Sequence, residues 1–279
     1  ELGLLCMDMP EMYGGGGLDF TFNSLFIEAL AKKGINGPGF SLHSDIVAPY
    51  LLNYGTEAQK QKYLPAMAKG EIITAIGMTE PNCGSDLKAL RTTAEDKGDH
   101  YLVNGQKTFI TNGFMCDMAI VAVKTNANRN DEGVSLLIME SAMEGFNKGI
   151  PSKKIGMKSQ DTAELFFDNV KVPANQLLGN ASQGFAYLMQ EPPRERTAIA
   201  ATALGAIRGA IDVTTQYVQE RQAFGQKVGS FQNTRFVLAQ AKIDELATAA
   251  FYNQNLALYK EGKLDVETAA ALKSFSSDM

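Results

Sequence analysis

Hydrophobic positions near the start of the chain recur at helical spacing. Between Thr21 and Lys33 apolar side chains fall three or four residues apart, and Gly34 follows as a stop signal, so we expect a helix there. A second helix is expected around residues 44–53. Thr56 followed by Gln59 matches a capping box and predicts the start of a third helix. The first 71 residues are therefore predicted to be helical.

The pattern changes between residues 72 and 178. Short runs rich in Val, Ile, Thr and Phe are separated by Gly, Asn and Asp clusters, which is typical of strands joined by turns. The dipeptide Asn104-Gly105 has strand-like residues on both sides and predicts a hairpin turn. We expect a β domain built as a small barrel or sandwich. The clearest strand-like runs are residues 118–123, 134–139, 165–167 and 170–172.

The helical period returns after Gly184. Two apolar stripes predict two long antiparallel helices that would start a four-helix bundle, and a third helix is expected near Asp265. The predicted fold class is α+β and multidomain, with an N-terminal helical part, a middle β-barrel or sandwich domain and an incomplete C-terminal helical bundle. The expected boundaries are residues 1–71, 72–178 and 179–279. The stripes comprise Ile199, Ala203, Leu204, Ile207, Ala210, Ile211 and Val218, then Phe236, Ile243, Leu246, Ala247, Ala250, Phe251 and Leu258.

Composition narrows the class of protein. Apolar residues make up 45% of the 279 residues, enough to fill a sizeable core, which argues against disorder. The net charge is −5 and no run of Lys or Arg exceeds two residues, so we expect no binding to nucleic acid or to an anionic membrane. No stretch reaches the roughly 18 consecutive apolar residues of a membrane span, and no signal-peptide pattern opens the chain. We expect a soluble protein.

Few residues could hold a metal or form a hydrolase triad. Cys6, Cys83 and Cys116 have no Cys-x-x-Cys spacing, which argues against zinc and a disulfide framework and favours a reducing compartment. A triad or a His-ligated metal would rest on His43 or His100, and neither G-x-S-x-G nor H-E-x-x-H occurs. His43 lies in an apolar stretch typical of a core or capping histidine. No metal site is predicted.

Two polar clusters carry the strongest chemical signal. Residues 77–86 end an apolar stretch and then concentrate turn formers, and residues 107–113 form the second cluster. Such segments offer hydroxyl and backbone N–H groups to a ligand. The predicted hairpin would bring both clusters to one part of a sheet.

In these clusters the chain resembles the acyl-CoA dehydrogenase family. Residues 78–86 are similar to the family's flavin-proximal signature, and residues 109–113 to the strand that flanks the isoalloxazine ring. The resemblance covers essentially the whole chain. Compared with the family, the chain lacks one or two N-terminal helices and a large C-terminal portion, so we expect a fragment truncated at both ends. Three further segments agree in the family's order: residues 13–19, residues 154–156 with 161–165, and residues 221–225.

The resemblance implies FAD as the cofactor. The hydroxyls of Thr79 and Thr111 would hydrogen-bond the flavin ring, while neighbouring apolar side chains would exclude water. The alternative, that Thr and Phe are ordinary strand formers, stays open. Ser85 matches a position near ligand phosphates and the acyl-CoA substrate, with a plain Ser-Asp turn as the alternative, and Cys83 departs from the family's usual Gly, Ala or Ser. The residues assigned to the flavin here are Met78, Thr79, Gly84, Ser85, Phe109, Ile110 and Thr111.

A second set of residues resembles those that reach the pyrophosphate and adenosine of a flavin held mainly by a neighbouring subunit. The set comprises Arg221, Phe224, Phe231 and Gln232. The planar fork of an arginine suits a diphosphate, although a solvated arginine at a helix end is the alternative. The resemblance therefore implies a homo-oligomer, a dimer of dimers, in which each flavin site needs two chains.

Glu195 is the candidate catalytic base. Pro192 and Pro193 suit a first helical turn, which places Glu195 near the start of the first long helix. The Glu195-Arg196 pair resembles the family's long-chain and isovaleryl types, and Arg196 would orient or neutralise carboxylates at the substrate site. A helix N-terminus and flanking arginines lower a carboxyl pKa, whereas abstracting a weakly acidic C–H proton calls for a raised one. Desolvation by bound substrate could reverse that sign; a first-turn glutamate salt-bridged in water is the alternative.

The implied activity is FAD-dependent α,β-dehydrogenation of an acyl-CoA thioester to a trans-2-enoyl-CoA, as in fatty acid β-oxidation, with electron-transferring flavoprotein as electron acceptor. Two alternatives stay open. One is a flavin-dependent acyl-CoA oxidase of the same superfamily, and the other is a non-catalytic flavin- or CoA-binding fragment. The expected location is the bacterial cytoplasm or the mitochondrial matrix of a eukaryote.

Overall fold

A computed structural model describes residues 2–125 and 133–279, and the chain divides into two compact units. Unit 1 contains the chain up to Leu18 together with Gly37–Glu191, and unit 2 contains Asp19–Asn36 together with Pro192–Met279. Compactness thus groups an early helix with the C-terminal helices. The three domain boundaries expected from the sequence divide the chain differently and stay a prediction.

The helices of unit 1 begin and end at local signals. A π-helical turn, Leu42–Val47, leads into α2 (Ala48–Tyr54), and α3 (Glu57–Lys69) follows. The predicted capping box is confirmed, because Thr56 Oγ1 accepts from Gln59 N at 3.3 Å and Gln59 Oε1 accepts from Thr56 N at 2.9 Å. A last helix, α4, spans Gly184–Gln190, and short 3₁₀ turns lie at Glu11–Tyr13, Leu87–Ala89 and Ala174–Gln176.

An eight-stranded mixed sheet forms the centre of unit 1. Its strand order is β6-β7-β3-β2-β4-β5-β8, and β1 pairs in parallel with β4 beside this path. The expected strand runs are confirmed, with residues 165–167 and 170–172 belonging to one strand. The strands are β1 (Thr74–Gly77), β2 (Thr93–Asp96), β3 (His100–Thr111), β4 (Met118–Lys124), β5 (Val134–Glu140), β6 (Phe146–Lys148), β7 (Thr162–Pro173) and β8 (Leu177–Leu178).

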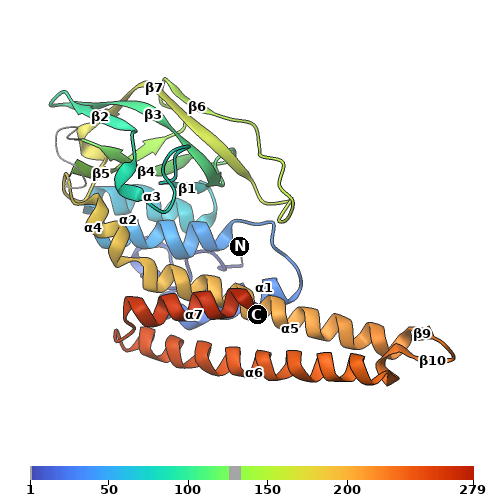
Figure 1. The fold of residues 1–279 in the computed structure, drawn as a ribbon. Helices are drawn as coiled ribbons and strands as arrows, with labels where there is room; N and C mark the ends of the chain where they lie inside the picture. Colours follow the sequence, from blue (N-terminus) through green and yellow to red (C-terminus); the bar gives the residue numbers. More distant parts are fainter. Residues whose placement is uncertain (1, 126–132) are drawn as a thin grey trace. The chain divides into compact units, whose positions relative to one another are not determined.

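Strand β4 is buried on both faces, which explains its unbroken apolar run. Ile120 packs in a cluster with residues of α2 and α3, and these helices lie against one side of the sheet (Figure 1). Val121 points the other way, into a cluster that also contains Val103 of β3 and Leu165 of β7. The sheet therefore curves so that its two halves enclose a common core, as expected for a small barrel or sandwich.

The hairpin predicted at Asn104-Gly105 is wrong, because β3 continues through both residues. The turn between β2 and β3 lies at Gly98 instead, which has a φ of 94°, and Lys97 N donates to His100 O at 2.9 Å. Pairing with β7 shifts register between Val103 and Gly105, and the extra residue of this bulge lies on β7, opposite Asn104. Glycine is needed there for close approach, since a Cβ on Gly105 would lie 2.7 Å from the Cα of Thr92. The Asn-Gly signal reflects this bulge.

Unit 2 is helical. Helices α5 and α6 run antiparallel and are joined by a small β-hairpin (Figure 1). Asp19 and Asp265 cap the N-termini of α1 and α7, accepting from Thr21 N at 2.8 Å and Thr268 N at 2.6 Å. The three helices expected after residue 184 are thus confirmed. The elements are α1 (Phe20–Lys32), α5 (Pro192–Glu220), β9 (Gln222–Ala223), β10 (Gln226–Lys227), a 3₁₀ turn at Val228–Ser230, α6 (Gln232–Lys260) and α7 (Val266–Asp278).

The buried faces of α5 and α6 differ from the predicted apolar stripes. The buried face of α5 consists mainly of small residues. The buried face of α6 includes Glu245, whose Oε1 lies 2.8 Å from Arg208 Nε. Phe236, Ile243 and Leu246 lie exposed on this single chain. Close helix packing selects small side chains and paired charges, so the largest apolar residues do not mark the face that packs here.

We expect Gly209→Ala to destabilise unit 2. A Cβ at this position would lie 2.4 Å from the backbone oxygen of Lys32 on α1. Alanine normally favours a helix over glycine by roughly 1 kcal/mol, but overpacking against backbone costs about 1–3 kcal/mol. Urea unfolding followed by circular dichroism measures the change. Gly156→Ala is the control, because no atom of the described residues lies within 4 Å of its added Cβ, beyond its chain neighbours. A more stable Gly209→Ala variant would contradict the tight α1–α5 contact.

Candidate functional site

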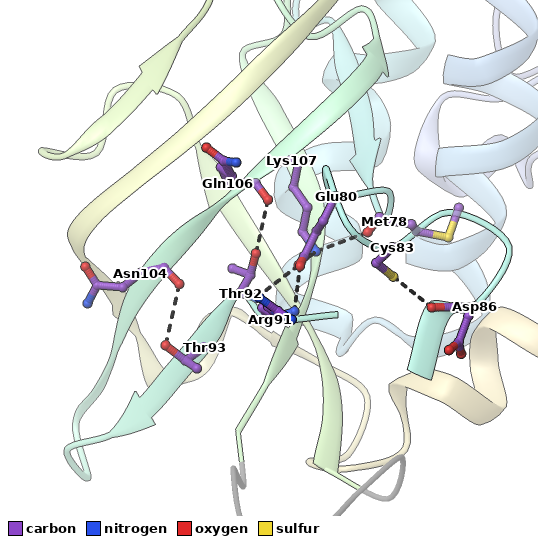
Figure 2. Close-up of polar contacts among 10 residues, drawn as sticks. All are labelled: Met78, Glu80, Cys83, Asp86, Arg91, Thr92, Thr93, Asn104, Gln106 and Lys107. Atoms are coloured by element: carbon purple, nitrogen blue, oxygen red, sulfur yellow. Dashed lines mark hydrogen bonds and ion pairs between the residues drawn. The ribbon is translucent and has the colours of Figure 1, made fainter. Parts of the chain in front are cut away.

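The two polar clusters meet in unit 1, although no hairpin joins them. Met78 and Thr79 continue the chain beyond β1, and Thr108 N donates to Thr79 O at 2.9 Å. The side chain of Lys107 also reaches this segment, with its Nζ 3.2 Å from Met78 O (Figure 2). Strand β3 therefore holds the first cluster directly, and both clusters come together as expected.

A second bulge, this one in β3, turns Phe109 outward. The pairing register with β7 shifts between Lys107 and Ile110. Phe109 has a φ of 56° and 71% of its surface is exposed. An aromatic residue in left-handed backbone is an outlier, and such strain gathers at functional sites. Ile110 is buried in the sheet interior, so only its backbone could meet a ligand, while Thr111 is half-buried at the end of the strand.

The loop after β1 presents Gly84 and Ser85 to solvent. Backbone hydrogen bonds join Glu80 and Cys83 in both directions, at 2.8 and 3.0 Å. The Cys83 thiol donates to Asp86 O at 3.0 Å (Figure 2), and burial raises the pKa of this thiol. Cys83 therefore braces the loop from within as a protonated thiol. Among the described residues, and apart from its chain neighbours, no atom lies within 4 Å of a Cβ added to Gly84, so a ligand can approach the backbone there.

A buried ion pair lies beneath this loop, and the sequence analysis missed it. Lys107 Nζ lies 2.7 Å from Glu80 Oε1, and the two side chains are 0% and 5% exposed. Burial lowers the pKa of Lys107, and the charge of Glu80 partly offsets that effect. Burial would raise the pKa of Glu80, but the charge of Lys107 and hydrogen bonds from Lys107, Thr92 and Arg91 hold it below its usual range. One signal was available, since Lys107 shares the alternating positions of Tyr101 and Val103.

The segment around residues 154–162 fastens the end of β3. Lys154 Nζ donates to Thr162 Oγ1 at 2.9 Å. Asp161 accepts from two backbone groups, taking Asn112 N on its carbonyl at 3.1 Å and Met115 N on its carboxylate at 2.7 Å. Hydrogen bonds therefore join three of the family-like segments, residues 109–113, 154–156 and 161–165, at the end of β3.

The second predicted set gathers at one end of the α5–α6 pair in unit 2. Phe224 and Gly225 form the turn between β9 and β10, with φ of 53° and 77°. A turn with two such residues favours Asn and Gly, so Phe224 is strained, and it is 94% exposed. Its ring meets that of Phe231 edge to face, with centroids 6.3 Å apart. Arg221 follows the end of α5, and Gln232 begins α6; both are exposed.

Glu195 lies in the first turn of α5, as the two prolines predict, and it is half-buried. Arg194 places its guanidinium 4.5 Å from the ring centroid of Phe20 on α1. Arg196 donates to the carbonyl of Val266, where α7 begins, at 3.3 Å. The first turn of α5 is thus held by contacts with two other helices of the same unit. The roles of Glu195 and Arg196 stay predictions.

Within residues 2–125 and 133–279, no cluster of three or more His, Cys, Asp or Glu side chains could coordinate a metal ion. In the same part of the chain, no helix combines the length and apolarity needed to cross a membrane.

Comparisons with known proteins agree along the whole chain. Family models for the acyl-CoA dehydrogenase N-terminal, middle and C-terminal domains match residues 1–71, 75–170 and 182–279. The mitochondrial long-chain specific acyl-CoA dehydrogenase of Mus musculus is 45% identical over 99% of this chain, which spans 65% of that relative's length.

Solved structures extend the likeness to three dimensions. An acyl-CoA dehydrogenase from Geobacillus kaustophilus is 44% identical with a TM-score of 0.96, covering 99% of this chain and 73% of that one. Butyryl-CoA dehydrogenase from Megasphaera elsdenii is 34% identical with a TM-score of 0.94, covering 99% and 74%. The predicted α+β fold class is confirmed. The chain therefore belongs to the acyl-CoA dehydrogenase family.

Proposed function

We propose that the protein is an FAD-dependent acyl-CoA dehydrogenase that converts an acyl-CoA thioester to a trans-2-enoyl-CoA. The observation that carries this proposal is the contact of β3 with the segment that follows β1, where Phe109 has an exposed ring and strained backbone and its neighbour Thr108 donates to the Thr79 carbonyl. An acyl-CoA thioester is proposed as the substrate because the Mus musculus relative is a long-chain specific acyl-CoA dehydrogenase.

The residues of the β1–β3 junction fit FAD. A flavin ring is flat and apolar on its faces and polar along its edges. Phe109 and Met78 offer apolar surface, and Thr79 and Thr111 offer hydroxyl groups. The open space at Gly84 lets a phosphate approach backbone N–H groups. When bound, FAD would supply the two-electron chemistry by taking up the β-hydride at N5.

Glu195 would remove the pro-R α-proton of the acyl group and hold it on its carboxylate. The amide groups at the start of α5 favour the charged form of a first-turn carboxylate. An acyl chain that expels water from this carboxylate would raise its pKa, because desolvation disfavours charge, and would thereby make Glu195 a stronger base. Arg196, already tied to the Val266 carbonyl, would fix charge beside the substrate.

Arg221, Phe224, Phe231 and Gln232 would bind the diphosphate and adenosine of an FAD held mainly by a second copy of the chain. The 94% exposure of Phe224 supports this proposal, because an aromatic ring in strained backbone gains from stacking on a ligand. A homo-oligomer, as a dimer of dimers, would also cover the exposed apolar side chains of α6, among them Phe236, Ile243 and Leu246.

Electrons would leave the reduced flavin to electron-transferring flavoprotein. Cys6, Cys83 and Cys116 are buried thiols, which fits a reducing compartment. The proposed location is the cytoplasm if the source is bacterial and the mitochondrial matrix if it is eukaryotic. We propose no nucleic-acid partner, in line with the net charge of −5.

Glu195→Gln tests the catalytic assignment. FAD-loaded protein is mixed without oxygen with a panel of acyl-CoAs, and loss of visible flavin absorbance measures reduction. We expect the variant to bind acyl-CoA normally but to reduce flavin about 100-fold more slowly or worse, because general-base catalysis is lost. Glu220→Gln, at the far end of α5, is the control and should behave as wild type. Equal rates for Glu195→Gln and wild type would refute the assignment. Rapid reoxidation in air would instead indicate an oxidase.

Gly84→Val tests the ligand site without disturbing the fold. The described residues leave open space there and the backbone φ is not left-handed, so we expect unchanged thermal unfolding. A branched side chain would obstruct the approach of a phosphate, and FAD or acyl-CoA should bind roughly tenfold more weakly, about 1.4 kcal/mol. Titration calorimetry measures both ligands. Glu95→Val, at an exposed position of β2 outside the candidate site, is the control. Undiminished affinity in Gly84→Val would place the ligand elsewhere.

A further inference from the structure

We infer that the buried Glu80–Lys107 pair is a positioning pair for the flavin: it fixes the backbone of Met78 and Thr79 and the β3 bulge that presents Phe109. The identity of the ligand rests on the proposed function. The geometry of the pair and of the bulge does not.

The pair joins three segments of the chain at one point. Lys107 Nζ, on β3, donates to Glu80 Oε1 at 2.7 Å and to Met78 O at 3.2 Å. Glu80 Oε1 also accepts from Thr92 N at 3.0 Å, and its Oε2 accepts from Arg91 N at 2.5 Å, where the chain enters β2 (Figure 2). Both carboxylate oxygens are therefore engaged, and one side chain ties the extension of β1 to the strands β2 and β3.

The position of this tie matters because the sheet ladder is interrupted beside it. Pairing with β7 passes from Lys107 directly to Ile110, so the intervening bulge is shaped by other contacts. One is the bond from Thr108 N to Thr79 O, and the other is the bond from Lys107 Nζ to Met78 O. Lys107 is thus the last ladder residue before the bulge and also grips the segment that faces it. Loss of its ammonium would free both sides together.

Gly77, at the end of β1, leaves space for the aliphatic part of the Lys107 side chain. A Cβ added to Gly77 would lie 3.2 Å from Lys107 Cγ, so a glycine at the end of β1 leaves room for the side chain to pass. A buried ion pair is costly to desolvate, and an apolar pair of similar volume often gives equal or greater stability. A pair in this place is therefore expected to contribute geometry more than stability. That difference makes the inference testable.

Three variants separate geometry from stability: Lys107→Met, Glu80→Gln and the double variant that combines them. Each single change leaves one buried charge without its partner, so both should lose stability. The double variant removes both charges and keeps one acceptor oxygen for the N–H groups of Arg91 and Thr92, so it should recover part of the unfolding temperature that the single variants lose. We expect it to recover neither the shape of the bulge nor the environment of the flavin.

Two readouts follow the geometry. In FAD-free protein, the rate of amide hydrogen exchange at residues 108–111 should rise roughly tenfold in Lys107→Met, with core amides of β4 as the internal reference. The reason is that loss of the ion pair lowers the free energy of local opening. In FAD-loaded protein, the visible absorption spectrum and the flavin reduction potential should shift, and the double variant should keep that shift. Glu80→Gln serves as the second single variant if Lys107→Met fails to fold.

Two controls isolate the effect. Val121→Ala weakens the sheet core and gives a reference with similar loss of stability and an intact pair. Lys62→Met removes another ion pair of unit 1. In that pair Lys62 on α3 lies 2.5 Å from the carboxylate of Glu140 on β5. Equal exchange at residues 108–111 and equal flavin spectra and potentials in Lys107→Met and Val121→Ala would overturn the inference.

Failure of the proposed function would look different. Wild-type protein that takes up no FAD would contradict that function and, with it, the ligand named here. The exchange comparison in FAD-free protein would still decide whether the pair shapes the bulge.

Discussion

A buried charge or backbone polar group must find a partner inside the protein, and the site in unit 1 is arranged around that constraint. Lys107 is fully buried in unit 1, and its contacts with the Glu80 carboxylate and the Met78 carbonyl offset the cost of burying its charge. Glu80 in turn serves two backbone N–H groups at the entry to β2. The strand that carries Lys107 bulges immediately after this residue, and the bulge exposes Phe109 in strained backbone.

Local signals predicted those parts of the fold that local chemistry decides. The capping box at Thr56 and Gln59 was readable because it satisfies N–H groups within a few residues. The runs that became β4 and β5 were readable because both faces of each strand are buried. The Asn104-Gly105 pair misled because a glycine needed for close approach to Thr92 looks the same as a glycine needed for a turn.

Tertiary packing decided the rest. The large apolar residues of α6 were predicted to face its neighbours, but Thr248, Ala249 and Glu245 do so, because tight helix contact rewards small size and Arg208 neutralises the carboxylate. In the candidate site, the resemblance pointed to exposed residues, because each of them belongs to a short motif that can be recognised within one segment of the sequence. It did not locate the Glu80–Lys107 pair, since that pairing exists only once two distant strands meet.

The close passage of α1 over Gly205 and Gly209 has a consequence for how the chain is made. Helix α1 ends at Lys32, whereas α5 begins at Pro192, so a ribosome completes all of unit 1 before the partner of α1 emerges. At about 5–20 residues per second, α1 waits on the order of ten seconds with its packing face uncovered. Its apolar positions would be an exposed segment on the nascent chain during that interval, when a chaperone could hold it.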